Sequence, residues 1–119
     1  MILRVVRCVG CRAWVSELDG VACCGSCGVL AVQGAYDCKL TRMERKLLRV
    51  VLHRPGAARE EVITNLWPNP DVEPENVENI IYVLKCKINA KALWVQVKLQ
   101  DRRARCDGGA TYRTVCHAA

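Results

Sequence analysis

Nine cysteines provide the clearest chemistry in this 119-residue chain, and six of them fall within its first third. Two pairs have the same two-residue gap, Cys8 with Cys11 and Cys24 with Cys27. Two thiolates at this spacing can hold one ion from a tight turn. Two such pairs complete the tetrahedral four-sulfur shell that Zn²⁺ accepts. The spacing therefore predicts a zinc site with these four cysteines as ligands.

The neighbouring cysteine at position 23 leaves the ligand set open. A set that includes Cys23 is conceivable, but Cys24 is preferred because it repeats the gap of the first pair. We expect Cys23 and Cys38 to lie in the interior as small hydrophobic residues. A shell of four thiolates has no open position for water or substrate, which indicates a structural metal. A thioredoxin-like redox role would require a βαβ context that the sequence does not indicate.

The residues between the two cysteine pairs predict short strands. Trp14, Val15, Leu18 and Val21 are spaced like strand residues on both sides of the turn-forming Asp19-Gly20. Residues 5–32 therefore resemble a zinc ribbon. A segment shorter than about 40 residues buries too little surface to fold alone, so bound zinc is expected to supply much of its stability.

Charge divides the chain near residue 38. The net charge of +6 lies entirely in residues 39–119, which hold 15 basic and nine acidic side chains, whereas residues 1–38 hold three of each. No Pro/Ser-rich linker separates the segments. We expect two packed modules, a zinc-ribbon-like module over 1–38 and a basic module over 39–119.

The basic segment predicts three helices. Thr41 and Glu44 form a capping-box pattern, and the apolar residues after them predict a buried helix that ends before Pro55-Gly56. A second helix is expected over about 59–67. A third is expected over about 75–90, opened by the proline at position 74.

The third helix carries two contrasting faces when its residues are placed at ~100° intervals. Its apolar stripe comprises Val77, Ile80, Ile81, Leu84 and Ile88. Its opposite face comprises Glu75, Asn79, Tyr82 and Cys86, flanked by Asn76 and Val83, with Lys85 and Lys87 on the shoulders. Hydrogen-bonding groups between two cations suit a helix lying in a groove between phosphate strands. An ordinary amphipathic helix with a solvated face is the alternative.

The end of the chain predicts a basic β-hairpin. Residues 93–100 alternate between apolar and polar, Asp107-Gly108-Gly109 favours a turn, and 112–115 form the returning strand. Its tip carries Arg102, Arg103 and Arg105. Three helices followed by such a hairpin predict a winged helix. The expected fold class is therefore α+β: a zinc ribbon of short β-hairpins, then a three-helix winged helix-turn-helix with a C-terminal β-hairpin wing.

Several motifs of the basic segment are similar to those of a known family. They are Leu40-Thr41-x-x-Glu44-x-x-Leu47-Leu48, Pro55-Gly56, Arg59-Glu60-Glu61, Leu66-Trp67, Leu84-Lys85-x-Lys87-Ile88 and Tyr112-Arg113. On these motifs, residues 29–116 resemble the DNA-binding effector domain of OmpR/PhoB-type response regulators.

The resemblance implies that the third helix enters the major groove and the wing reaches an adjacent minor groove. The turn at 68–73 would touch RNA polymerase. By position, Asn79, Tyr82, Val83 and Lys85 would face DNA, with Arg113 near the wing. The chain departs from the family in having no receiver domain, a longer hairpin and a partly neutral recognition helix. Phosphorylation control is therefore not implied, and base preference must differ.

These features predict a sequence-specific, double-stranded DNA-binding transcriptional regulator with a structural Zn²⁺. An asparagine can pair bidentately with adenine, and arginines suit a narrow minor groove. The expected DNA-binding residues are Asn76, Asn79, Tyr82, Val83, Lys85, Lys87, Arg102, Arg103, Arg105 and Arg113. A homodimer and a complex with RNA polymerase are further expectations, and the architecture suits a bacterial or phage regulator.

A second function class is a zinc-stabilised adaptor that binds a protein such as RNA polymerase through the winged helix. Acidic Asp71, Glu73, Glu75 and Glu78 near the start of the third helix favour it, because they repel phosphate.

Membrane and enzyme functions are not expected. No apolar run approaches the ~20 residues that span a bilayer, and residues 1–7 lack the apolar stretch of a signal peptide. We expect a cytoplasmic protein, nucleoid-associated if bacterial.

His53 and His117 have no partner at a catalytic spacing. A second metal site from Cys86, Cys106, Cys116 and His117 is disfavoured by irregular spacing.

Overall fold

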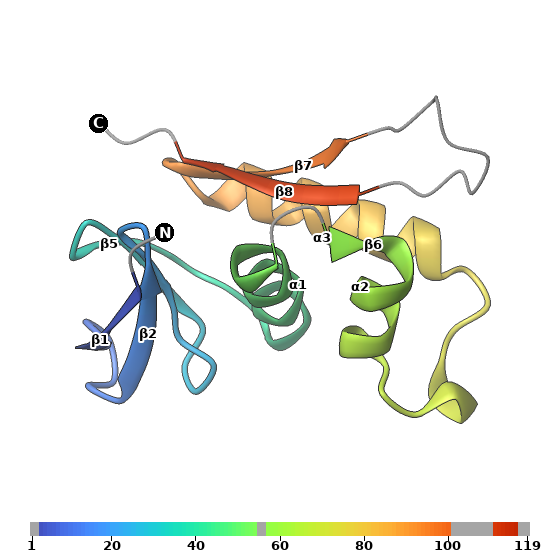
Figure 1. Cartoon of the computed structure of the whole chain (residues 1–119), viewed down its shortest axis with the longest axis horizontal. Coiled ribbons are helices and arrows are strands. Elements are labelled where there is room, and N and C mark those ends of the chain that lie inside the picture. The colour runs from blue at the N-terminus through green and yellow to red at the C-terminus, as the bar shows by residue number, and fades with distance from the viewer. Residues whose placement is uncertain (1–2, 55–56, 101–110, 117–119) are drawn as a thin grey trace.

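The chain is a mixed α+β structure with a five-stranded antiparallel sheet, three helices and a second, three-stranded sheet, and α1 lies between the first sheet and α2 (Figure 1). The computed structural model describes residues 3–54, 57–100 and 111–116. The strands are β1 (Leu3–Arg7), β2 (Trp14–Leu18), β3 (Val21–Cys23), β4 (Val29–Val32), β5 (Ala35–Lys39), β6 (Ala57–Ala58), β7 (Val95–Gln100) and β8 (Thr111–Cys116). The helices are α1 (Arg42–His53), α2 (Arg59–Leu66) and α3 (Val77–Lys91), with a 3₁₀ turn η1 (Pro70–Val72).

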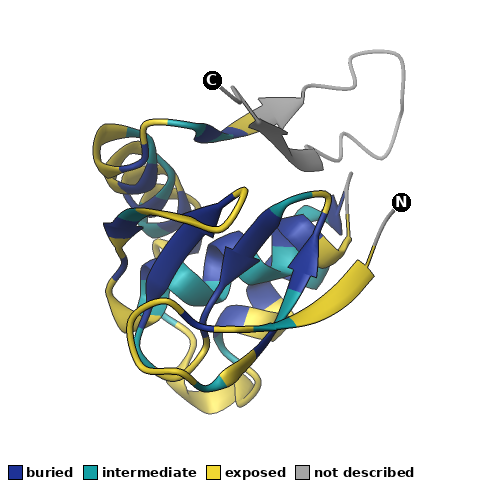
Figure 2. Ribbon diagram, turned by 90° about the vertical axis from the view of Figure 1, so that its left-hand side faces the viewer, coloured by how far each residue is buried: buried dark blue, intermediate teal, exposed yellow. Residues whose placement is uncertain are grey.

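The first sheet is a meander in which each strand pairs with the next, in the order β1-β2-β3-β4-β5. The predicted turn at Asp19-Gly20 is confirmed. Leu18 pairs with Val21 across it, and both turn residues have positive φ, as a tight hairpin turn requires. The sheet continues through β5 to Lys39, beyond the 5–32 segment that resembles a zinc ribbon. Figure 2 shows the edge strand β1 as mostly exposed and the central strands as buried.

The first two helices lie where the sequence predicts them. The capping box of α1 is confirmed, because Thr41 Oγ1 accepts from the Glu44 N–H at 3.5 Å and Glu44 Oε1 accepts from the Thr41 N–H at 2.9 Å. Helix α1 ends at His53. Helix α2 ends at Leu66, and Trp67 is its C-cap.

Helix α3 begins later than predicted. We expected its first turn at residues 74–75, but the helix begins at Val77 and Asn76 is its N-cap. The backbone of Asn76 has φ −103° and ψ 46°, outside the helical region. Glu75 and Asn76 therefore precede the helix, and the expected recognition face loses these two residues from its helical register. The helix continues to Lys91, one residue beyond the predicted end.

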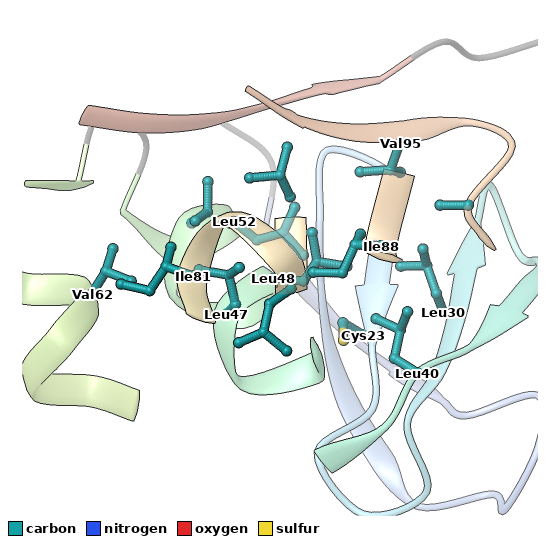
Figure 3. Close-up of a cluster of buried hydrophobic side chains, with 14 of the residues drawn as sticks. Cys23, Leu30, Leu40, Leu47, Leu48, Leu52, Val62, Ile81, Ile88 and Val95 are labelled. Atoms are coloured by element: carbon teal, nitrogen blue, oxygen red, sulfur yellow. The ribbon is translucent and has the colours of Figure 1, made fainter. Parts of the chain in front are cut away.

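One hydrophobic core runs across residue 38. Buried residues of the first sheet, including Cys23 and Leu30, pack with Leu48 of α1 and Ile88 of α3 (Figure 3). A smaller cluster lies beside the cysteine pairs and consists of Cys8, Val15, Ala22, Cys24 and Val29. The two predicted segments thus share the main hydrophobic core, whereas the small cluster belongs to the first segment alone.

The second sheet has the order β6-β8-β7 and ties the end of the chain to the helices. Strand β6, which the sequence did not predict, pairs Ala57 with Tyr112. Strands β7 and β8 are antiparallel, with Val95 opposite Cys116. The expected hairpin tip, with Arg102, Arg103 and Arg105, lies outside the described residues. In the part of the chain that the structure describes, no helix is both long and apolar enough to cross a bilayer.

Candidate metal centre and nucleic-acid interface

The four predicted cysteine ligands meet at one point. The sulfur atoms of Cys8, Cys11, Cys24 and Cys27 all lie within 4.8 Å of one another. The Cys8–Cys27 sulfur distance is 3.5 Å and the Cys11–Cys24 distance is 3.7 Å. A Zn–S bond of about 2.3 Å gives sulfur separations of roughly 3.8 Å in a tetrahedron. The four cysteines are therefore close enough to bind one metal ion, and their geometry is consistent with zinc.

Two neighbouring hairpins supply these ligands. The loop between β1 and β2 carries the first pair, and the loop between β3 and β4 carries the second. In each loop a backbone amide points at the first sulfur of the pair, Gly10 N–H at Cys8 Sγ (3.3 Å) and Ser26 N–H at Cys24 Sγ (3.4 Å). Such amide donors stabilise thiolates and fix the ligands before the metal arrives.

The protein environment separates the acidities of the second pair. Burial acts to raise the pKa of Cys24, but the backbone N–H groups of Cys27 and Ser26 lower that pKa to about 6. Burial raises the pKa of Cys27 to about 12, opposed by the Val29 N–H and reinforced by the Cys8 thiol. The backbone N–H groups thus favour a thiolate in this pair, and a bound cation must displace the remaining proton.

Cys23 and Cys38 do not join this group. Both are buried in the main core. Burial raises the pKa of Cys23 to about 12, although the charge of Arg49 acts in the opposite direction. Burial also raises the pKa of Cys38 to about 11, with a contribution from Asp37. The expectation that these two thiols behave as interior hydrophobic residues is confirmed.

Helix α3 presents the predicted polar face to solvent. Its apolar stripe is buried at Val77, Ile81, Leu84 and Ile88, with Ile80 half-buried. The exposed predicted contact residues are Asn76, Asn79, Tyr82, Val83 and Lys87, and Lys85 is half-buried. The burial of one stripe fixes which residues a ligand along α3 could reach.

Two side chains on this face interact with each other. The ammonium of Lys85 lies over the ring of Tyr82, 5.0 Å from its centroid. The neighbouring Cys86 thiol raises the pKa of Tyr82. Tyr82 is 58% exposed and Val83 is 40% exposed, so neither belongs to the core.

The remaining predicted contacts lie at the other end of the chain. Arg113 is in β8, opposite Lys98 of β7. The three arginines of the hairpin tip, and Cys106 and His117, lie outside the described residues.

The first turn of α3 and the segment before it are acidic. Asp71, Glu73, Glu75 and Glu78 are all exposed. Glu78 forms an ion pair with Arg59 of α2 at 2.6 Å, so part of this negative charge is neutralised locally. This end of the helix is a poor phosphate-binding surface.

Helix α1 also carries a cationic face that was not predicted. Arg42, Arg45, Lys46, Arg49 and His53 recur at helical spacing along one side of it. The spacing of these basic residues is visible in the sequence, but the prediction of this helix used only its apolar side.

Comparisons with known proteins found no relative of this chain. A scan against family profiles, a search of curated proteins and a search of solved structures each found no match.

Proposed function

We propose that this protein binds double-stranded DNA sequence-specifically and regulates transcription, with α3 as the recognition helix. The observation that carries the proposal is the solvent-exposed face of α3, where Asn79 and Tyr82 lie between Lys85 and Lys87. A helix with hydrogen-bonding side chains at its centre and cations beside them fits the major groove.

The order of the elements supports a winged-helix reading. Three helices are followed by the antiparallel pair β7–β8, and β6 joins that pair to the helices. In this arrangement the β7–β8 hairpin is the proposed wing. Arg102, Arg103 and Arg105 would contact the minor groove or the backbone, and Arg113 would contact a phosphate near the wing.

Zinc is the proposed resident ion of the four-cysteine centre, in a structural role. All four positions of the tetrahedron would be occupied by sulfur, which leaves no place for a reacting group. The ion would hold the two hairpins of the first sheet together and so support the surface on which α1 packs.

A protein-binding adaptor is the second candidate function. It is favoured by the exposed acidic residues before α3 and by the exposed Val72 in η1. An RNA polymerase subunit is the partner that this alternative proposes. It predicts that changing both Arg102 and Arg103 to glutamine leaves DNA retention unchanged, whereas the primary proposal predicts that DNA retention is abolished.

Selection from random duplex DNA tests the primary proposal. The zinc-loaded protein is used to retain duplexes at near-physiological salt, and the retained pool is sequenced. A recurring motif is the expected result, and its symmetry reports whether one or two copies bind. Recovery of unselected sequence, or of nothing, would contradict base reading and favour the adaptor.

A further inference from the structure

A groove of about 500 Å³ runs along the outward side of α1, between the second cysteine pair and α2. Six basic side chains line it, namely Arg42, Arg45, Lys46, Arg49, His53 and Arg54. Gly25 of the cysteine loop and Asn65 of α2 also line it. The groove lies on the side of α1 opposite the buried Leu47, Leu48 and Val51.

The positive charge in this groove is largely uncompensated. Arg54 pairs with Glu61 of α2 at 2.8 Å. In the described ranges, the cations at positions 42, 45, 46 and 49 form no ion pair with a carboxylate, and no carboxylate lines the groove. Like charges three and four residues apart destabilise a helix by a few tenths of a kcal/mol per pair. An anionic partner would relieve this repulsion.

One cation of the groove contacts the loop that carries the second cysteine pair. Arg49 Nη1 donates a hydrogen bond to the Cys23 carbonyl at 2.7 Å. A Cβ built on Gly25 would lie 3.2 Å from the same nitrogen, so the guanidinium packs against the backbone of the cysteine loop. Both contacts position this cation from the first sheet rather than from α1 alone.

We propose that this groove binds the phosphodiester backbone of duplex DNA, as a sequence-independent contact separate from α3. The ligand rests on the proposed function. The groove chemistry argues for a duplex over a single strand, since no Phe, Tyr or Trp stands among the described residues that line the groove and could stack on unpaired bases. It also argues against a protein partner, because Val50 is the one large apolar residue among the described lining residues.

The test compares two variants with the same loss of charge. In the groove variant, Arg42→Gln is combined with Lys46→Gln; neither side chain has an ion-pair partner among the described residues. In the control, Arg12→Asn is combined with Lys39→Gln, two exposed positions outside the groove. Asparagine suits position 12 because Arg12 has φ 64°. Affinity for a labelled duplex of about 20 base pairs is measured over a series of salt concentrations.

The groove variant should bind every duplex roughly tenfold or more weakly at 0.1 M salt. Its plot of log affinity against log salt should be flatter by about two units, because two phosphate contacts are lost. The affinity of the control variant should stay within about twofold of that of the unaltered protein. An exchange that keeps the charges, Arg42→Lys with Lys46→Arg, should retain the full salt dependence.

The outcomes separate this inference from the proposed function. If the groove variant and the control bind alike while a selected motif is still preferred, the groove inference is overturned and base reading by α3 stands. If the groove variant loses all duplexes and Asn79→Ala does not change discrimination, the groove inference stands and sequence-specific reading falls. Failure of the unaltered protein to bind any duplex overturns both. Stronger binding of single-stranded RNA of equal length, or of polyglutamate, overturns the commitment to duplex DNA.

Discussion

Lys91 near the end of α3 donates a 2.6 Å hydrogen bond to Glu44 in the first turn of α1. The Glu44 side chain is 2% exposed, and the same Oε1 also accepts the Thr41 N–H of the capping box. The carboxylate therefore serves two helices at once, capping α1 and anchoring the proposed recognition helix.

This relationship makes stability depend on pH in a defined window. Burial acts to raise the pKa of Glu44, but the hydrogen bond from Lys91 and the N–H of Thr41 outweigh it, and the net pKa is lowered. A carboxyl with a lowered folded-state pKa stabilises the fold fully above its unfolded pKa of about 4.3. This contribution is lost as the pH falls through the folded-state value.

Glu44→Gln should therefore cost about 2–3 kcal/mol near pH 7, because it leaves Lys91 without its carboxylate partner. The difference in unfolding free energy between the two proteins should shrink below about pH 4.3. Urea denaturation from pH 3 to 7 measures this difference. A cost that does not vary with pH would assign the effect to packing rather than to the ion pair.

Metal content distinguishes the candidate ligand cysteines from Cys23 and Cys38 of the main core. Changing Cys24 to serine should abolish stoichiometric zinc, because three sulfurs no longer close the tetrahedron. The matched control is Cys23→Ala, which alters the adjacent residue in the core and should retain one zinc per chain. Zinc is measured by elemental analysis after dialysis. Zinc loss in the Cys23 variant alone would show that Cys23, and not Cys24, is the ligand.

Removal of the metal should affect the two hydrophobic clusters unequally. The small cluster contains two of the candidate ligands, Cys8 and Cys24, whereas the main core spans the first sheet and all three helices. Chelation should thus speed amide hydrogen exchange most around Val15 and Val29 and least in α3. Exchange followed by mass spectrometry with and without chelator measures this contrast. Uniform acceleration would show that zinc supports the whole fold.

Gly28 should tolerate no side chain. It has φ +84°, and a Cβ there would lie 2.2 Å from the Leu40 carbonyl oxygen. Gly34 has a similar φ of +80° with nothing within 4 Å, so it is a matched control. Alanine at Gly34 should cost about 1–2 kcal/mol for the left-handed backbone, and alanine at Gly28 clearly more. Equal costs in urea denaturation would mean that the close approach is relaxed without penalty.

Local patterns predicted much of this structure. The capping box at Thr41, the hairpin turn at Asp19-Gly20 and the group of four neighbouring cysteines each depend on residues close in sequence, or on pairs with a fixed gap. Such features can be predicted before the fold is known, since the backbone geometry at these spacings is nearly fixed.

The features that were missed depend on contacts between distant residues. Lys91 meets Glu44 across 47 positions. Strand β6 has only two residues and exists because β8 pairs with it. The late start of α3 is a local exception, because asparagine is a favoured N-cap residue and Asn76 could have been read as the N-cap. The groove on α1 becomes visible only when the cysteine loop lies beside the helix.

Asn79→Ala tests the central claim most directly. Affinity is measured for the duplex recovered by selection and for the same duplex with its motif scrambled. If α3 reads base edges, the substitution should cost ~1–3 kcal/mol on the selected duplex and little on the scrambled one. An equal loss on both duplexes would contradict base reading by Asn79, and no loss on either would remove α3 from the interface.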